Sequence, residues 1–352
     1  MCLLVAPVAN VAMKLLILGG TRFLGRHLVR AALARNHEVT LFNRGKHTSE
    51  AGVETIRGDR HTDLAKLHGR RWDAVVDTSG MLPRAVKAAA EALSDSVGHY
   101  TFISTQNVYA DVSIPGVTED SPLTTLTSEQ LDHAYAIDTS GEPAYGKLYG
   151  GLKALCEQAA KSVMPGRVLT IRPGLIVGPD DYTDRFTYWV VRVARGGEVL
   201  VPGRADTFVQ FIDVRDLADW TLSMIERNET GAFNAHGLPG RLTMGDVLDE
   251  CKSVSGSEAS FTWASEEFLL RENVAPWSDM PLWLPEEAAP HLKGFMFINC
   301  EKAVGAGLRF RPINDTIAAT LAWYQANPRN ELKAGLTPDT EQSLLGKLHS
   351  TR

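Results

Sequence analysis

A glycine-rich turn near the start of the chain constrains the fold more than any other feature of the sequence. The segment Leu18-Gly19-Gly20-Thr21-Arg22-Phe23-Leu24-Gly25 follows a short apolar run and precedes a helical pattern. Glycines allow a tight turn and a close approach of the backbone, and the N–H groups at the start of the helix can hold a pyrophosphate. A purely structural turn is the alternative, so the surrounding segments must decide between the two interpretations.

Short β-branched or apolar runs alternate with helical patterns through the first half of the chain. This alternation is typical of βαβ units and a parallel sheet. The predicted strands are 14–18, 38–42, 53–57, 74–77, 100–104 and 167–172, and the predicted helices are 23–34, 84–93 and 144–162. Strands and helices in this order predict an α/β fold with a doubly wound parallel sheet.

The pattern becomes irregular in two later regions. Residues 111–141 are rich in Ser, Thr and Pro and predict a loop that overhangs the active site. Further along, 277–290 fits no regular element. Between and beside these regions we expect a small substrate lobe, with helices at 186–194, 214–226 and 243–255 and a strand at 208–212.

Charge and cysteine content narrow the class of partner. The net charge of -6 and the pI near 5.9 give no general attraction for phosphate backbones, so we expect no nucleic-acid partner. The cysteines lack metal-ligand spacing and a disulfide framework, which indicates a reducing, cytoplasmic location. We also expect no metal site, because the histidines most open to that interpretation lie far apart. The residues concerned are Cys2, Cys156, Cys251 and Cys300 and His99, His236 and His291.

The apolar N-terminus resembles the core of a signal peptide but is interrupted by Lys14. We interpret residues 1–12 as a short extension, or Met13 as the true start. No uninterrupted run approaches the roughly 20 apolar residues that span a bilayer, so we expect no membrane partner.

Asn43-Arg44 follows the second predicted strand, where the adenine ribose of a dinucleotide would lie. An acidic residue there would indicate NAD, whereas a guanidinium suits the 2′-phosphate of NADP. Arg22 in the glycine turn could supply a second cationic contact. The sequence therefore favours NADP(H), with NAD as the alternative cofactor and solvated surface arginines as the structural interpretation.

Tyr149 and Lys153 lie four residues apart in a predicted helix and so share one face. A nearby cation favours the phenolate and lowers the pKa of a tyrosine, as acid–base catalysis at a carbonyl requires. Such a pair alone is most often an ordinary surface contact, so it carries weight only together with other motifs.

Four segments, one of which carries this pair, occur in a specific order. They are Phe102-Ile103-Ser104-Thr105-Gln106-Asn107-Val108-Tyr109, Tyr149-Gly150-Gly151-Leu152-Lys153, Arg172-Pro173-Gly174-Leu175-Ile176-Val177-Gly178-Pro179 and Phe211-Ile212-Asp213-Val214-Arg215-Asp216-Leu217-Ala218. With the glycine turn, they resemble the extended short-chain dehydrogenases of the NAD-dependent epimerase/dehydratase family over about residues 13–235.

The resemblance implies a Rossmann domain that binds NAD(P) and a smaller C-terminal substrate lobe. We expect the Rossmann domain at 13–175 with parts of 205–235, the lobe at 176–204 and 236–330, and terminal extensions at 1–12 and 331–352. It also implies a homodimer formed through the helix that carries Tyr149 and the helix at 84–93.

The resemblance assigns roles to individual residues. Thr105 would hydrogen-bond the reacting oxygen, Tyr149 would be the acid–base and also contact the cofactor, and Lys153 would hold the nicotinamide ribose. The remaining implied cofactor contacts are Gly19, Thr21, Arg22, Phe23, Leu24 and Gly25 in the turn, Asn43, Arg44 and Asp59 near the adenine, Thr78, Ser79 and Gly80 after the fourth strand, and Pro173 and Ile176 near the nicotinamide.

Several positions depart from the family pattern. The turn has Arg22 in place of its middle glycine, which resembles the atypical branch of the family. Gln106 and Asn107 replace the acid pair of the dehydratases, and an amide is neither acid nor base, so dehydration is excluded. Leu175 and Val209 stand where nucleotide-sugar enzymes hold a diphosphate, with Arg204 or Arg185 as the substitutes available.

Three functions remain, and the first is preferred. The chain is expected to be an NADP(H)-dependent oxidoreductase that moves a hydride to or from a small-molecule ketone or alcohol, with a preorganised site for the developing alkoxide. The second is a sugar or sugar-nucleotide epimerase that keeps its NAD(P) bound. The third is a non-catalytic RNA-binding relative, which the acidic balance and the intact Tyr149/Lys153 pair disfavour.

Overall fold

The computed structural model describes residues 12–137 and 145–350. The chain divides into two compact units, which are described separately. The first unit comprises Met1–Val108, Thr125–Ile171 and Ala218–Ala232, and the second comprises Tyr109–Thr124, Arg172–Leu217 and Phe233–Arg352.

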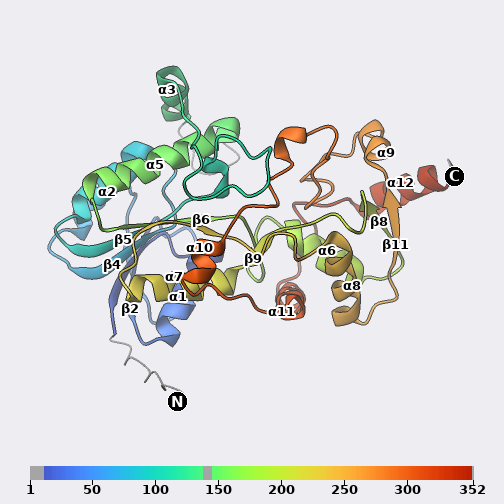
Figure 1. Ribbon diagram of the computed structural model, residues 1–352. Helices are drawn as coiled ribbons and strands as arrows, with labels where there is room; N and C mark the ends of the chain where they lie inside the picture. The colour runs from blue at the N-terminus through green and yellow to red at the C-terminus, as the bar shows by residue number, and fades with distance from the viewer. Residues whose placement is uncertain (1–11, 138–144, 351–352) are drawn as a thin grey trace, which may run out of the picture. The chain divides into compact units, whose positions relative to one another are not determined.

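A central sheet of seven strands is found among the described residues, in the order β10-β6-β5-β4-β1-β2-β3 (Figure 1). Ile17 in β1 pairs in parallel with Leu41 in β2 and with Val76 in β4. The predicted doubly wound α/β fold is therefore confirmed. The strands are β1 (Lys14–Leu18), β2 (Glu38–Asn43), β3 (Glu54–Arg57), β4 (Trp72–Asp77), β5 (Val97–Ile103), β6 (Val168–Pro173) and β10 (Gly231–Ala235).

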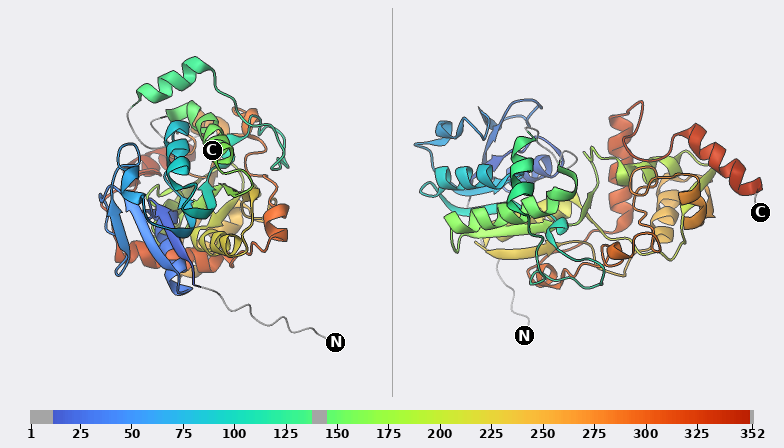
Figure 2. Two further views of the ribbon diagram at one scale, coloured as in Figure 1. Left: turned by 90° about the vertical axis from the view of Figure 1, so that its left-hand side faces the viewer. Right: turned by 90° about the horizontal axis from the view of Figure 1, so that it is seen from above.

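Helices cover both faces of this sheet (Figure 1). Helices α2 (Pro83–Leu93) and α5 (Tyr149–Val163) lie side by side on one face (Figure 2), and α1 (Phe23–Ala34) and α7 (Val214–Glu226) cover the other. Arg35, which caps α1, donates hydrogen bonds of 3.0 Å to Ser223 and Glu226 of α7. Because both faces are covered, the residues of β1 after Lys14 and of β4 after Asp73 are all buried.

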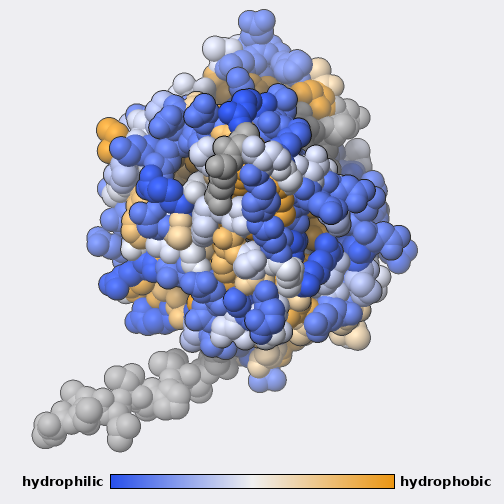
Figure 3. Space-filling model, turned by 90° about the vertical axis from the view of Figure 1, so that its right-hand side faces the viewer, coloured by the Kyte–Doolittle hydropathy of each residue, from blue (hydrophilic) through white to orange (hydrophobic). Residues whose placement is uncertain are grey.

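The second unit has its own apolar core, built around the fully buried Trp189 of α6 (Arg185–Ala194). The indole N–H of Trp189 donates a 2.8 Å hydrogen bond to the carbonyl oxygen of Pro281, which satisfies its only polar atom. The neighbouring Tyr188 is buried in the same core. Hydrophilic residues interrupt the apolar areas on the face shown in Figure 3.

The other elements are short or lie in the second unit. Two small parallel sheets pair β7 (Leu175–Val177) with β9 (Phe211–Asp213) and β8 (Glu198–Pro202) with β11 (Ser260–Ala264). The remaining helices are α3 (Ser128–Ala136), α8 (Met244–Ser255), α9 (Glu266–Arg271), α10 (Glu301–Gly305), α11 (Ile313–Ala326) and α12 (Pro338–Ser350), and the 3-10 helices are η1 (Leu64–Leu67), η2 (Gln106–Val108), η3 (Gly146–Leu148) and η4 (Pro290–Leu292).

Two local predictions were wrong. The predicted loop at 111–141 contains helix α3, which begins with a capping box in which Thr127 and Gln130 satisfy each other's backbone N–H groups. The predicted strand at 208–212 is confined to Phe211–Asp213, while Phe208 forms only an isolated bridge. Residues 138–144 of the predicted loop and helix lie outside the described residues.

Helix α12 occupies most of the stretch expected to be a C-terminal extension. Its Leu344, Leu345 and Leu348 belong to the buried core of the second unit. A helix that buries three leucines contributes to the stability of that core.

Candidate active site

The glycine turn between β1 and α1 has the geometry that glycine alone readily adopts. Gly19 and Gly20 have φ angles of 106° and 84°, in the left-handed region. A Cβ atom on Gly25 would lie 2.9 Å from the Cα of Gly20, so this glycine allows α1 to pack against the turn. Both features are consistent with a backbone that must pass close to a ligand.

The N-terminus of α1 is suited to an anion. No side chain caps the helix at Arg22, and its first turn contains no acidic residue. The positive end of the helix dipole therefore faces no acidic side chain of the helix's own first turn. This arrangement fits the pyrophosphate of a dinucleotide. Thr21 and Phe23 are half-buried beside it, whereas Leu24 points into the core.

The end of β2 is linked to the glycine turn by a side chain. The amide nitrogen of Asn43 donates a 3.1 Å hydrogen bond to the carbonyl oxygen of Gly19, and its amide oxygen accepts the N–H of Gly45 at 2.8 Å. Asn43 thus fixes both loops that would surround an adenosine. Arg44 is exposed on the second of these loops.

Arg57 is a cation near this place that sequence reasoning missed. It ends β3 opposite Asn43 in the sheet register, and its Nε would lie 3.2 Å from a Cβ atom on Gly45. Its guanidinium therefore lies across the loop that carries Arg44. The signal was available in the sequence, because residues that end neighbouring parallel strands lie at the same edge of the sheet.

Asp59 shapes the loop that follows β3. Its carboxylate accepts the N–H of His61 at 2.9 Å, while its own N–H donates to the carboxylate of Asp63 at 2.8 Å. Two such bonds hold the turn in one conformation. The carboxylate of Asp63 has a pKa below its ordinary value, chiefly because it accepts the Asp59 N–H.

The loop after β4 is attached to the glycine turn through the carbonyl oxygen of Leu18. That oxygen accepts hydrogen bonds from the N–H and hydroxyl of Thr78, at 3.1 and 2.9 Å, and from the hydroxyl of Ser79 at 3.1 Å. Gly80 completes the loop in a tight space, where a Cβ atom would lie 2.6 Å from a methyl group of Val86. The structure thus brings 19–25, 43–44 and 78–80 together at the carboxyl edge of the sheet.

A buried ion pair between Arg60 and Asp77 lies beneath this loop, and the sequence analysis did not identify it. The guanidinium contacts both carboxylate oxygens at 2.9 and 2.8 Å, and the hydroxyl of Tyr100 donates to the same carboxylate at 2.8 Å. Burial pushes the pKa of Asp77 upward, but Arg60 and the hydrogen bonds outweigh burial and hold it below 3.8. The sequence did contain a signal for this pair, because Asp77 ends an apolar run and a carboxylate buried there needs a charged or hydrogen-bonding partner.

Thr105 and Tyr149 lie at the carboxyl end of β5 and at the start of α5. Thr105 is buried, and its hydroxyl oxygen accepts the N–H of Asn107 at 3.2 Å. Tyr149 is the first residue of α5 and is half-buried. Lys153 follows one helical turn later, as the spacing predicts.

Lys153 is held inside the first unit by two backbone carbonyl groups. Its ammonium donates to the carbonyl oxygen of Ile103 at 2.7 Å and to that of Gly80 at 2.8 Å, and it lies 4.1 Å from the centre of the Phe102 ring. Burial lowers the pKa of Lys153 below 10.5. The side chain is therefore fixed in position, with a cation that is easier to deprotonate than a free lysine.

Close packing places α5 against the end of β5. A Cβ atom on Gly150 would overlap the carbonyl oxygen of Asn107, and one on Gly151 would lie 2.6 Å from the side chain of Leu126. Further along α5, the buried carboxylate of Glu157 accepts a 2.6 Å hydrogen bond from the hydroxyl of Ser104. These contacts fix the position of α5 against the sheet, and with it the positions of Tyr149 and Lys153.

Pro173 and Ile176 belong to the second unit, at the end of β6 and within β7. In this unit Val209 is buried in the apolar core and Leu175 packs against it. Arg204, one of the two arginines considered for a diphosphate, is paired at 2.9 Å with Asp206, and the other, Arg185, lies 5.3 Å from the Trp277 ring. The positions that would hold a diphosphate are thus occupied by apolar packing.

The described part of the chain holds neither a metal-ligand cluster nor a helix that could span a membrane. Within residues 12–137 and 145–350 no group of three or more His, Cys, Asp or Glu residues could hold a metal ion. The ring nitrogen Nε2 of His99 donates a 2.8 Å hydrogen bond to the carbonyl oxygen of Glu229, and Cys156, Cys251 and Cys300 are free and buried. Over the same residues, no helix is both long enough and apolar enough to cross a membrane.

The parallel sheet, the glycine turn at its carboxyl edge and the Tyr149–Lys153 pair together define a Rossmann-fold protein of the short-chain dehydrogenase type. The chain belongs to the NAD dependent epimerase/dehydratase family, whose model matches residues 15–235. It is accordingly an NAD(P)-dependent enzyme of that family.

Individual relatives differ in what their names describe. A 2-alkyl-3-oxoalkanoate reductase from Stenotrophomonas maltophilia is 32% identical over 48% of this chain, and the match spans only 52% of that relative's length. The chloroplast stem-loop binding protein of 41 kDa b from Arabidopsis thaliana is 26% identical over 80% of this chain and 74% of its own. The structure of a UDP-glucuronic acid 4-epimerase from Bacillus cereus with NAD superposes with a TM-score of 0.62 at 18% identity, covering 90% and 100% of the two chains.

Proposed function

We propose that this protein is an NADP(H)-dependent oxidoreductase that interconverts a ketone and an alcohol. The observation that carries the proposal is the buried ammonium of Lys153, fixed by Ile103 and Gly80 one helical turn from Tyr149. An ammonium fixed one helical turn from a half-buried phenol suits acid–base chemistry at a carbonyl oxygen.

In the proposed mechanism Tyr149 donates its phenolic proton to the carbonyl oxygen of the substrate, or accepts it in the reverse direction. The Lys153 cation favours the phenolate and so brings the pKa of Tyr149 toward the working range. The hydroxyl of Thr105 hydrogen-bonds the same oxygen while negative charge develops on it. NADP(H), when bound, supplies or accepts the hydride.

The proposed cofactor contacts are those of the glycine turn, the adenosine loops and the turn after β4. The 2′-phosphate of NADP would be recognised by Arg44, with Arg22 and Arg57 as further cations. No acidic side chain ends β2, where a ribose without the phosphate would need one. The full proposed set adds Gly19, Thr21, Phe23, Leu24, Gly25, Asn43, Asp59, Thr78, Ser79, Gly80, Lys153, Pro173 and Ile176.

The proposed substrate is a ketone without a nucleoside diphosphate. Leu175 is a half-buried apolar side chain and Val209 is buried in the core, so neither gives a diphosphate a polar partner, and an unpaired diphosphate would be costly. The name of the reductase relative supports a 3-oxoalkanoate as the first compound to try. We further propose that the second unit supplies the substrate lobe and that α2 and α5 form a homodimer contact; a cytoplasmic location stays a prediction.

The decisive experiment measures the loss of NADPH absorbance with a panel of 2-alkyl-3-oxoalkanoates, with NADH and with UDP-glucose as comparisons. We expect NADPH oxidation by an oxoalkanoate and none by UDP-glucose, and expect Tyr149→Phe to abolish it. Interconversion of UDP-sugars by a protein purified with bound NAD would instead establish the epimerase. Affinity for a stem-loop RNA that survives Tyr149→Phe and falls steeply with salt would establish the binding function.

A further inference from the structure

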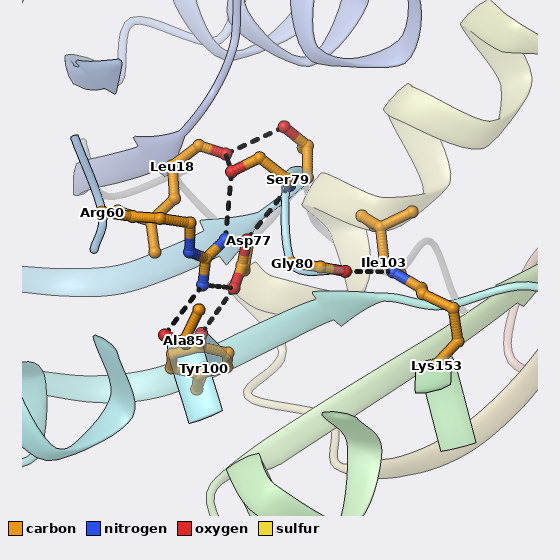
Figure 4. A network of polar contacts seen from close by, with 10 residues as sticks. Leu18, Arg60, Asp77, Ser79, Gly80, Ala85, Tyr100, Ile103 and Lys153 are labelled. Atoms are coloured by element: carbon orange, nitrogen blue, oxygen red, sulfur yellow. Dashed lines mark hydrogen bonds and ion pairs between the residues drawn. The ribbon is translucent and has the colours of Figure 1, made fainter. Parts of the chain in front are cut away.

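The ion pair between Arg60 and Asp77 has no part in the proposed mechanism, yet its contacts reach the catalytic lysine (Figure 4). Asp77 is fully buried, and the side chain of Arg60 is only 11% exposed. The two residues come from different strand ends, since Asp77 ends β4 and Arg60 follows β3. Their pairing therefore joins two loops that line the cofactor site.

Both partners also hold the turn after β4. The carboxylate of Asp77 accepts the N–H of Ser79 at 3.1 Å, and Arg60 donates to the hydroxyl of Ser79 at 3.1 Å and to the carbonyl oxygen of Ala85 at 3.3 Å. Ser79 is in turn bonded to the carbonyl oxygen of Leu18 in the glycine turn. One residue of this turn is thus fixed from three directions.

The next residue along the turn is the one that contacts Lys153. The carbonyl oxygen of Gly80 accepts a 2.8 Å hydrogen bond from the ammonium (Figure 4). A Cβ atom on Gly80 would lie 3.0 Å from the Asp77 carboxylate, so the turn rests directly on the ion pair. A displacement of Ser79 would move the carbonyl group that holds the catalytic cation.

Stability alone is a weak reason for such a pair. Two buried charges lose their hydration, and well-packed apolar residues of the same volume are often at least as stable. A carboxylate that accepts bonds from Arg60, Tyr100 and Ser79 does, however, define one geometry. The pair accounts for a precisely placed turn better than it accounts for a stable fold.

We propose that Arg60 and Asp77 are positioning residues for Lys153: their buried ion pair fixes the Ser79-Gly80 turn and thereby the ammonium. This inference rests on the proposed function, because it assumes that Lys153 serves the acid–base tyrosine. It adds a link between the adenosine side of the site, where Arg60 follows Asp59, and the proton-transfer side.

The two charges also act on Lys153 with opposite signs. Burial lowers the pKa of Lys153 most, while Cys156, Asp77 and Glu157 raise it and Arg60 lowers it. These groups come from α5, from β4 and from the loop after β3. Removing one member of the pair should therefore shift the titration of Lys153 in a direction that identifies which charge was lost.

The test compares Asp77→Asn, Arg60→Met and the double variant with the wild-type protein. The primary readout is the titration of the Lys153 side-chain nitrogen, followed by NMR in protein labelled with ¹⁵N-lysine and assigned with Lys153→Met. We expect a lower midpoint in Asp77→Asn and a higher one in Arg60→Met, because each variant removes one of the two opposite charges that act on the ammonium. Arg60→Lys should return the midpoint toward that of the wild-type protein.

Calorimetric binding of NADPH and the pH profile of kcat give the second and third readouts. The double variant loses one positive and one negative buried charge, so we expect its Lys153 midpoint to stay near that of the wild-type protein. Without the ion pair the turn is no longer fixed, so we expect the dissociation constant for NADPH to rise by about tenfold and kcat to fall. This variant keeps the test decisive if a single variant fails to fold. Glu341→Gln, which breaks the buried Arg192–Glu341 pair of the second unit, is the control and should change none of the three readouts.

Equal Lys153 midpoints in the folded variants, together with unchanged NADPH binding in the double variant, would overturn the inference. Failure of the proposed function gives a different result. In that case the wild-type protein neither binds NADPH nor oxidises it, while the Lys153 titrations still show whether the charges of the ion pair act on the ammonium.

Discussion

The ammonium of Lys153 on α5 donates a 2.7 Å hydrogen bond to the carbonyl oxygen of Ile103, the residue at which β5 ends. This bond anchors the helix that carries Tyr149 to the strand that leads to Thr105, two residues further on. Thr105, Tyr149 and Lys153 thus lie at one edge of the sheet, although Thr105 and Tyr149 are 44 residues apart in the sequence.

The lowered pKa of Lys153 predicts an alkaline limit to activity. Burial holds this pKa below 10.5, so the cation is lost as the pH rises through that lowered value and the phenolate of Tyr149 loses its support. We expect kcat to fall on the alkaline side before a free lysine would titrate. Lys153→Met should lower kcat by about 100-fold and remove this limb from the pH profile. A limb that persists in Lys153→Met would assign it to another group.

Replacement of the proposed acid–base tests the role of Tyr149 directly. We expect Tyr149→Phe to lower kcat by about 10²–10⁴-fold, with little change in NADPH binding, because only the proton-transfer group is lost. Tyr135→Phe is the matched control, since Tyr135 lies in α3 and stacks under Arg84. A similar loss of kcat in both variants would show that the effect comes from the fold.

The sheet and its helices were predictable because their signals are local. Helix α1 and strand β1 have the predicted bounds, since the glycine turn and the alternating apolar runs mark where each begins and ends. Helix α3 was missed because its start depends on the reciprocal bonds of Thr127 and Gln130, which a Ser- and Thr-rich composition hides.

The candidate site was predictable only in part. Residues in family motifs, such as Thr105 and Lys153, were named from the sequence, and their chemical roles stay predictions. The Arg60–Asp77 pair was missed because its members are 17 residues apart and meet only when β3 and β4 are assembled in the sheet. Pairings between strand ends are tertiary, and no periodicity along the chain records them.

Cofactor preference can be tested at the end of β2. We expect Arg44→Ala to weaken NADPH binding by about 10-fold or more and to leave NADH binding almost unchanged, because only the 2′-phosphate contact is removed. Arg57→Ala should have the same selectivity with a smaller effect. Arg70→Ala is the control, since Arg70 is paired with Glu54 at 2.8 Å. Equal losses for both cofactors, measured by calorimetry, would contradict recognition of the phosphate.

The packing of Gly150 on Asn107 predicts a steric limit in α5. Gly150→Ala would bring a methyl group onto the carbonyl oxygen of Asn107, so α5 must move away from η2. Overpacking of this kind costs typically about 1–3 kcal/mol of unfolding free energy, and it should also lower kcat by displacing Tyr149. Denaturant unfolding and kcat check both effects. Gly346→Ala, at an open helical position in α12, should change neither.

A buried histidine predicts how the second unit responds to acid. His236 is fully buried, and burial lowers its pKa from 6.5 to about 3. Below pH 6.5 the unfolded chain binds a proton that the folded chain does not, so this residue should lower the free energy of unfolding by about 1.4 kcal/mol for each pH unit down to about pH 3. In His236→Gln this dependence should disappear, whereas His68→Gln, at an exposed position, should retain it. Urea unfolding between pH 4 and 7 measures how the free energy of unfolding depends on pH. Equal slopes in the wild-type protein and in His236→Gln would show that His236 does not titrate on unfolding.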